Sequence, residues 1–225
     1  MAGAPTAENP RAAGSGTLRL VLASNNAKKL AELRALLDGL ALTLVAQGEL
    51  GIAEAEEPHP SFVENALAKA RHAAAASGGA AIADDSGLCV AALGGDPGVV
   101  SAHAAGLVAP LADREATRRA QDAANNQWLL ARMRELTDRR ARFVSTLVAL
   151  RHADDPEPLI ALGRWDGEIL RAPRGAGGFG YDPLMWIPGL GATVAELPAE
   201  VKNAHSHRAR AAAQMRELMR QAWGL

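Results

Sequence analysis

Short apolar runs alternate with amphipathic stretches along the first third of the chain. The runs at 18–23, 41–46 and 80–83 have the length and character of buried strands. Between the first two runs, leucines recur at the i, i+3, i+4 spacing of one buried helix face, which predicts a helix over 27–37. This part of the chain therefore predicts strands and helices in alternation, as in an α/β protein.

Three further helices are predicted by their starts and their apolar spacing. Ser61, with Glu64 three residues later, matches a capping box, so a helix should begin there and run to about residue 76. Helical periodicity also covers 113–136 and 197–223, where apolar residues again fall on one face.

The pattern changes after residue 140. The segments 142–150 and 158–165 are rich in strand-forming residues and are separated by Asp154-Asp155-Pro156, which is a hairpin signal. Asp166-Gly167 predicts another turn directly afterwards. Alternating strands and helices followed by an antiparallel meander predict a mixed α/β sheet flanked by helices, with two lobes and a central cleft, in a single domain over 17–225.

Composition narrows the class of protein. The chain has 225 residues, of which 48% are apolar, so we expect a globular fold. No apolar run approaches the ~18 residues that cross a membrane, so no membrane partner is expected. Residues 1–16 lack the apolar core of a signal peptide and are expected to form a disordered leader. A single cysteine excludes an internal disulfide and suits a reducing compartment, so we expect a cytoplasmic protein.

Charge argues against one class of partner and points to another. With 24 basic and 25 acidic side chains the net charge is -1, whereas a nucleic-acid binder usually has a basic excess. We therefore expect no nucleic-acid partner, but a small phosphorylated ligand needs only a few well-placed cations. Only four of the 24 basic residues are lysines, which indicates positions where a compact ammonium is wanted: Lys28, Lys29, Lys69 and Lys202.

The loop 24–29 lies between the carboxyl end of one predicted strand and the amino end of a helix. Free backbone N–H groups and the helix dipole favour an anion there, and Lys28 and Lys29 lie alongside. The loop is not a Walker A sequence. An ordinary Ser/Asn helix cap with two solvated lysines would show the same pattern, so this loop alone leaves both interpretations open.

The segment 84–87, Asp-Asp-Ser-Gly, follows the apolar run at 80–83, and its Ser-Gly pair predicts a turn at the end of that strand. Two adjacent carboxylates in such a place could hold Mg²⁺, which prefers carboxylate oxygens and retains several waters. A solvated turn is the alternative. The acidic loop 49–57 ends with three glutamates in four positions, which could lend a further ligand or be solvated surface.

The segment 174–183 places four glycines within six positions, which lets its backbone approach a ligand closely. Phe179 and Tyr181 lie in the same loop and could offer a stacking surface to a base. Asp182 could accept a hydrogen bond from a base or sugar. A flexible turn with incidental aromatic residues is the alternative.

Basic residues crowd the start of the last predicted helix, where Lys202, His207 and Arg208 occur within seven positions. Cations at the amino end of a helix oppose its dipole unless an anion binds there. Contact with a phosphate or a base is therefore the functional interpretation, and a structural histidine is the alternative. His205 and His207 have the wrong helical spacing to share a metal.

Five separated stretches, taken in order, resemble the inosine/xanthosine triphosphate pyrophosphatase family and together span nearly all of 18–223. They are 24–29, 61–69, 82–88 with 94–98, 177–183 and 206–208. The motifs IADDSGL, GGFGYDP and SHR are specific in combination. The resemblance implies an elongated mixed α/β fold and a homodimer. It also implies hydrolysis of non-standard purine nucleoside triphosphates (dITP/ITP, XTP/dXTP) to the monophosphate and pyrophosphate, which cleanses the nucleotide pool.

The resemblance further implies roles for individual residues. Asp85 would be a metal ligand and the general base, and Glu57, or Glu56 in its place, would be the second ligand of Mg²⁺. Ser86 would contact the substrate. The residues implied in binding the triphosphate are Ser24, Asn25, Asn26, Ala27, Lys28, Lys29 and Lys69. Those implied in the nucleotide pocket are Phe179, Gly180, Tyr181, Asp182, Lys202, His207 and Arg208.

The chain departs from the family pattern in two places. Ser24-Asn25-Asn26 replaces the common Thr-Gly-Asn, and His103-Ala104 stands where Arg-Tyr is common. Two other functions fit the same residues, namely a different Mg²⁺-dependent nucleotide phosphohydrolase and a nucleotide-sensing module without catalysis. The paired aspartates and the acidic loop argue against a mere binder of anions.

Overall fold

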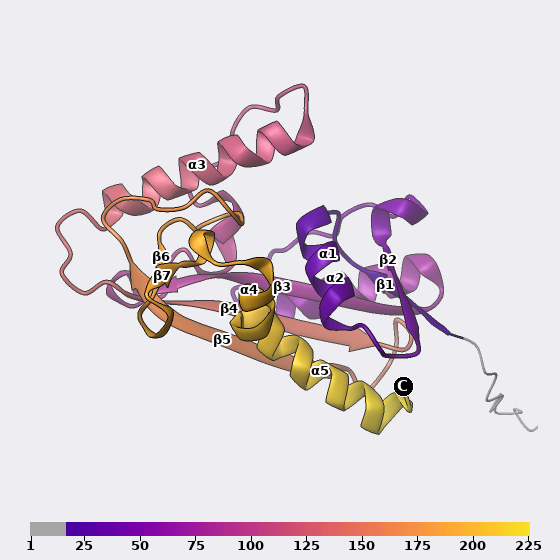
Figure 1. Ribbon diagram of the computed structural model, residues 1–225. Helices are drawn as coiled ribbons and strands as arrows, with labels where there is room; N and C mark the ends of the chain where they lie inside the picture. Colours follow the sequence, from indigo (N-terminus) through magenta and orange to yellow (C-terminus); the bar gives the residue numbers. More distant parts are fainter. Residues whose placement is uncertain (1–16) are drawn as a thin grey trace, which may run out of the picture.

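The computed structural model describes residues 17–225, and the leader expected over 1–16 lies outside the described residues. One seven-stranded sheet has the strand order β2-β1-β3-β4-β5-β6-β7 (Figure 1). The strands are β1 (Leu18–Leu22), β2 (Leu42–Ala46), β3 (Ala80–Val90), β4 (Arg140–Leu150), β5 (Leu159–Ile169), β6 (Met185–Ile187) and β7 (Ala192–Thr193). The helices are α1 (Ala27–Leu36), α2 (Phe62–Ser77), α3 (Arg114–Arg132), α4 (Ala199–His205) and α5 (His207–Trp223).

The sheet is mixed, as the sequence predicts. Strands β2, β1 and β3 pair in parallel, whereas β3, β4, β5, β6 and β7 pair antiparallel. The three long strands β3, β4 and β5 extend through both ends of the molecule (Figure 1). The first lobe consists of β1, β2, α1 and α2 at one end, and the second lobe consists of α3, β6 and β7 at the other.

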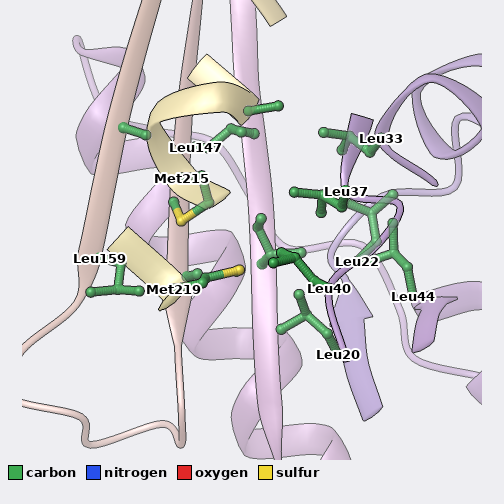
Figure 2. Close-up of a cluster of buried hydrophobic side chains, with 14 of the residues drawn as sticks. Leu20, Leu22, Leu33, Leu37, Leu40, Leu44, Leu147, Leu159, Met215 and Met219 are labelled. Carbon is green, nitrogen blue, oxygen red and sulfur yellow. The ribbon is translucent and has the colours of Figure 1, made fainter. Parts of the chain in front are cut away.

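Both faces of the sheet are covered in the first lobe because its strands carry apolar residues on both sides. Leu20 and Leu22 of β1 point toward α1 and α5, where they pack with Leu33 and Met215 (Figure 2). The alternate residue Val21 points to the opposite face and packs against the alanines of α2. Alanines at 66, 70, 73 and 74 let α2 lie close to the strands, which fixes the position of its polar side chains relative to β3.

The second lobe has its own core, built from α3 and the far ends of the long strands. Leu129 of α3 and Met133, which follows the helix, are fully buried in one cluster with Phe143 and Trp165. Asp113 caps α3 by accepting hydrogen bonds from the backbone N–H groups of Glu115 and Ala116. The predicted start of this helix is therefore confirmed, although α3 ends at Arg132 and not near residue 136.

Two predicted turns are wrong. The segment 84–87 does not end a strand, because β3 runs from Ala80 to Val90 and pairs with β4 throughout that segment. Gly87 serves a different purpose from the one predicted: a Cβ there would clash with the Gly98 carbonyl, where the following loop crosses the strand. Asp166-Gly167 likewise lies inside β5, where sheet pairing with β4 outweighs the local turn preference.

The helix predicted over 197–223 is broken at Ser206 into α4 and α5. Ser206 has an extended backbone, and its hydroxyl accepts from the Ala209 N–H, which starts α5 anew. The break turns His207 and Arg208 toward the sheet, where both are buried. Within the described residues, no helix has the length and apolar character needed to cross a membrane.

Candidate active site

A cavity of about 360 Å³ lies where the two lobes meet. Its walls come from the loop after β1, the glycine-rich loop 174–183, the α4–α5 junction and one face of α3. The predicted site residues that line it are Ser24, Asn25, Asn26, Lys28, Lys29, Glu57, Lys69, Ser86, Phe179, Gly180, Tyr181, Asp182, Lys202, His207 and Arg208. Ala27, Glu56 and Asp85 are not part of its wall.

The position of the cavity follows from the sheet. β1 pairs with β3 only as far as Ile82, whose carbonyl accepts from the Ala23 N–H. The next carbonyl on that edge, Asp84 O, has no strand beside it and instead accepts from Lys29 Nζ at 3.5 Å and Lys69 Nζ at 3.3 Å. In open α/β sheets ligands bind outside the carboxyl ends of parallel strands, which is where these lysines converge.

The loop after β1 is organised by its own side chains. Ser24 Oγ accepts from the Asn26 N–H at 3.1 Å, and Asn26 Oδ1 accepts from the N–H groups of Lys28 and Lys29 at 3.0 and 3.2 Å. These hydrogen bonds use three of the backbone N–H groups that were expected to bind an anion, those of Asn26, Lys28 and Lys29. The ammonium groups of Lys28 and Lys29 therefore provide the main anion-binding donors of this loop.

Asp84 and Asp85 point to opposite faces of the sheet because they are neighbours in a strand. Asp84 is 1% exposed and accepts from Ser145 Oγ at 2.7 Å, Arg208 Nη2 at 2.8 Å and Lys29 Nζ at 3.0 Å. Burial would raise the pKa of Asp84, but the charges of Arg208 and Lys29 and these hydrogen bonds hold it well below its usual value. Asp84 is therefore a permanent anion that positions two cations of the cavity.

Asp85 faces the opposite way, toward α2. Its Oδ1 accepts from Lys69 Nζ at 2.8 Å, while Oδ2 is buried and has no hydrogen-bond partner among the described residues. Burial raises the pKa of Asp85 to about 6, although the Lys69 charge opposes the shift. A carboxylate with a pKa close to neutral and an unpartnered oxygen suits a general base.

Glu57 lies on the same side of the sheet as Asp85 and shares Lys69 with it, at 3.0 Å from Nζ. Among residues 17–225 no three His, Cys, Asp or Glu side chains gather as a metal site. The carboxylates of Glu57 and Asp85, the latter with a buried oxygen that lacks a described partner, could hold a cation that needs few protein ligands. Mg²⁺ is such a cation, because water and phosphate oxygens complete its coordination shell.

The opposite end of the cavity is aromatic and cationic. The Phe179 ring has Lys202 Nζ 4.5 Å and Arg208 Cζ 6.0 Å from its centre. Asp182 holds this arrangement together, because its Oδ2 accepts from the Phe179 N–H and from Lys202 Nζ, both at 2.9 Å. A Cβ at Gly178 would clash with Asp182, and the left-handed φ of +73° also favours glycine there.

Tyr181 differs from the prediction that it offers a stacking surface. It is 4% exposed, and its hydroxyl donates to the Ser101 carbonyl at 2.9 Å. The ring therefore belongs to the core of the second lobe, and Phe179 remains as the aromatic residue of the loop that is partly open to the cavity.

His207 stacks on Phe143, with ring centres 5.0 Å apart, and its Nδ1 is buried without a partner. Burial first, and then the charge of Arg208, hold the pKa of His207 well below its usual 6.5, against the opposing charge of Asp84. Gly163 of β5 lets α5 approach this closely, since a Cβ there would clash with the His207 carbonyl. The imidazole is therefore neutral in the folded protein at physiological pH.

This burial predicts a pH-dependent stability. Below pH 6.5 the unfolded chain protonates His207 and the folded protein does not, so the free energy of unfolding should fall with pH by up to about 1.4 kcal/mol per pH unit from this group. Urea denaturation between pH 7 and pH 5 should show a shallower decline for His207→Gln than for the unsubstituted protein. The exposed His152→Gln is the matched control, and equal slopes for both variants would contradict the prediction.

Several residues of the site carry no signal in the sequence. Glu32 of α1 joins Lys202, at 3.1 Å, to Arg208. Arg118 and Asp122 of α3 line the cavity from the second lobe. Each occupies an ordinary polar position on a helix, and only the packing of that helix against the sheet brings it to the site. The position of Asp84 beside Asp85 did mark it in the sequence. Because a turn was predicted there, it was not anticipated that the two side chains point to opposite faces of a strand.

The cavity combines lysines at a strand end with an aromatic, cationic pocket, and one of these lysines, Lys69, binds the buried carboxylate of Asp85 behind the wall. A mixed α/β sheet with such a cavity defines a protein that handles a phosphorylated nucleotide. Residues 20–218 match the model of the Ham1 family. The chain belongs to this family, which confirms the resemblance identified from its motifs.

The relatives agree with this assignment. A protein of Methylibium petroleiphilum named dITP/XTP pyrophosphatase is 71% identical over 92% of this chain and 99% of its own length. A protein of Leptothrix cholodnii with the same name is 68% identical over 92% of this chain and 100% of its own. The solved structure of a HAM1 protein from Coxiella burnetii has 42% identity and a TM-score of 0.81, and covers 91% of this chain and 100% of that one.

Proposed function

We propose that the protein hydrolyses non-standard purine nucleoside triphosphates, dITP, ITP, XTP and dXTP, to the monophosphate and pyrophosphate. The observation that carries the proposal is the division of one cavity into two chemically different ends. Lys29 and Lys69 gather with their carboxylates at the end of β1, while Phe179 and Lys202 lie at the other end. Lys28 reaches between the two, with its Nζ 3.3 Å from the Gly178 carbonyl and 5.8 Å from the centre of the Phe179 ring. The name dITP/XTP pyrophosphatase, which the relatives from Methylibium petroleiphilum and Leptothrix cholodnii carry, supports dITP and XTP as substrates.

At the phosphate end, Lys28 and Lys29 bind the triphosphate and Asp85 acts on water. Asp85 Oδ2, which has no partner among the described residues, accepts a proton from the attacking water, and a pKa near 6 leaves Asp85 ionised at neutral pH. Lys69 holds Oδ1 at 2.8 Å and so fixes the orientation of the carboxylate.

Asp85 and Glu57 are the residues that would hold Mg²⁺. A bound Mg²⁺ supplies charge neutralisation to the phosphates and to the pyrophosphate that leaves. Oxygen donors from two carboxylates suit this cation, since Mg²⁺ is usually bound by one or two carboxylates together with substrate phosphates.

At the base end, the purine stacks on Phe179, and the donor that recognises its position 6 comes from Lys202, His207 or Arg208. Asp84, Ser86 and Glu32 accept from four of the five N–H groups of Arg208, and Glu32 and Asp182 pair with Lys202 Nζ, so each of these two cations keeps one N–H group for the base. Inosine and xanthosine present a carbonyl acceptor at position 6, whereas adenine presents an amino donor. A buried donor would remain unpaired against adenine, at a cost of about 1–3 kcal/mol.

The family resemblance supports a homodimer and a single catalytic domain over 17–225, and the single cysteine suits the reducing cytoplasm. We propose these properties for this chain as well.

A product assay tests the proposed function. With Mg²⁺ present, ITP should yield inosine monophosphate and pyrophosphate with a kcat/KM about 5- to 160-fold above that for ATP, because a mismatched donor costs about 1–3 kcal/mol. Chelation of Mg²⁺ should abolish turnover. Release of orthophosphate would favour a different phosphohydrolase, and tight binding of ITP without any product would favour a sensing module.

A further inference from the structure

The cations assigned above to the cavity are already neutralised by protein carboxylates. Five cations that line it are held in ion pairs by six carboxylates, so these groups carry no surplus positive charge for a triphosphate. The cations are Lys28, Lys29, Lys69, Lys202 and Arg208, and the carboxylates are Glu32, Glu57, Asp84, Asp85, Glu115 and Asp182.

Arg118 is different. It lines the same cavity from α3, is half-buried, and makes no ion pair with any carboxylate of residues 17–225. One of its terminal nitrogens, Nη2, donates to the Asn25 carbonyl at 3.1 Å. This hydrogen bond places a guanidinium from the second lobe directly at the loop that follows β1, the loop whose end carries Lys28 and Lys29.

The helix fixes how far Arg118 lies from the base end. Asp122, four residues later on α3, accepts from the Gly180 N–H at 2.9 Å, next to Phe179. Four residues of α-helix rise by about 6 Å, so Arg118 is displaced by that distance from the aromatic loop toward the amino end of α3. A nucleotide stacked on Phe179 with its phosphates toward the loop after β1 would carry its outer phosphates past Arg118.

We propose that Arg118 is a further substrate-binding residue, which donates to the outer phosphates of the triphosphate from the lobe opposite the phosphate-binding lysines. The proposal rests on the proposed function for the identity of the nucleotide. A guanidinium presents a planar set of donors that pairs with two phosphate oxygens at once, which a lysine ammonium does not do. Arg118 is also the one lysine or arginine of the cavity wall that forms no ion pair within 4.0 Å with a described carboxylate, although the charge of Asp122 lies one turn away on α3.

The alternative is that Arg118 only fastens α3 to the loop through Asn25. Arg114, which pairs with the exposed Glu54 at 3.1 Å, already joins the same two segments, since Glu54 accepts from Asn25 Nδ2 at 2.9 Å. A contact with a purely structural role would therefore be partly redundant with the contacts of Arg114, Glu54 and Asn25.

Binding and kinetics of Arg118→Ala test the proposal. The KM for ITP should rise about 10- to 100-fold with kcat changed far less, because charge-assisted hydrogen bonds to a charged group are worth about 1.5–3 kcal/mol. Calorimetry with inorganic triphosphate should show a similar loss of affinity, whereas the affinity for inosine monophosphate should stay unchanged. Arg118→Lys should recover part of the loss, since it keeps the charge.

Arg119→Ala is the matched control, because this neighbour on the same helix is 64% exposed and points away from the cavity. It should leave all three ligands unaffected. Unchanged triphosphate affinity in Arg118→Ala, or equal losses for triphosphate and monophosphate, would overturn the proposal. Triphosphate binding is measured without turnover, so a failure of the unsubstituted protein to hydrolyse ITP would overturn the proposed function separately.

Discussion

Asp85→Asn is expected to lower the turnover of ITP by about 10²- to 10⁴-fold, because an amide does not accept the proton that a general base removes from water. The variant keeps the size of the side chain and removes charge from a group with a single partner, Lys69, which retains Glu57 at 3.0 Å and the Asp84 carbonyl at 3.3 Å. Its fold should therefore persist. Pyrophosphate release measures the first expectation, and thermal unfolding measures the second.

The control for this substitution is Asp154→Asn, which neutralises an exposed carboxylate in the turn between β4 and β5. It should leave both turnover and melting temperature unchanged. If Asp85→Asn retained more than a tenth of the unsubstituted turnover, the assignment of Asp85 as general base would be wrong.

The second large effect concerns the neighbouring carboxylate, which points to the other face of β3. Asp84→Ala is expected to lower the free energy of unfolding by about 3–5 kcal/mol, because it leaves the buried Arg208 and Lys29 charges without their shared partner. Since the pKa of Asp84 is held below its usual 3.8 in the folded state, its contribution is present above that pH and is lost only as the pH falls further. Urea denaturation at neutral pH measures the difference.

A double variant separates this explanation from simple loss of packing. Asp84→Ala combined with Lys29→Met removes the charge that loses the only described carboxylate with which it pairs, whereas Arg208 keeps Glu32, so the double variant should be more stable than Asp84→Ala alone. If the double variant lost as much stability, relative to the unsubstituted protein, as the two single variants lose together, the ion pair would not be the cause.

Different effects at two adjacent positions follow from strand geometry, which the sequence pattern did not reveal. Asp84-Asp85-Ser86-Gly87 has the composition of a turn, and a turn at the end of the strand could place both carboxylates in the same site. The pairing of 84–87 with β4 instead keeps the segment extended and sends neighbouring side chains to opposite faces. A pairing between segments about 60 residues apart leaves no local mark in the chain.

Local signals did predict the elements that carry the cavity. The apolar runs predicted β1 and β2, and the capping residue Ser61 predicted the start of α2. Helical periodicity from residue 113 predicted α3, and the two segments flanking 154–156 predicted the hairpin of β4 and β5. Such signals depend on residues a few positions apart, so they can be recognised in the sequence before the fold is known.

Residues that reach the cavity only through tertiary packing could not be predicted. Glu32 is one turn beyond Lys28 on α1 and looks like an ordinary surface glutamate in the sequence, yet it contacts Lys202 and Arg208 from the far end of the chain. Arg118 is one of three arginines within six residues of α3, and nothing local distinguishes it from the exposed Arg119.

A crystal structure of Asp85→Asn with ITP and Mg²⁺ would test most directly whether the cavity between the two lobes holds the whole nucleotide. The hypoxanthine should lie on Phe179 beside Lys202, with the phosphates extending to Lys28 and Lys29 and the outermost ones within reach of Arg118. Density for the nucleotide outside this cavity, or with its base at the loop after β1 and its phosphates on Phe179, would contradict the assignment.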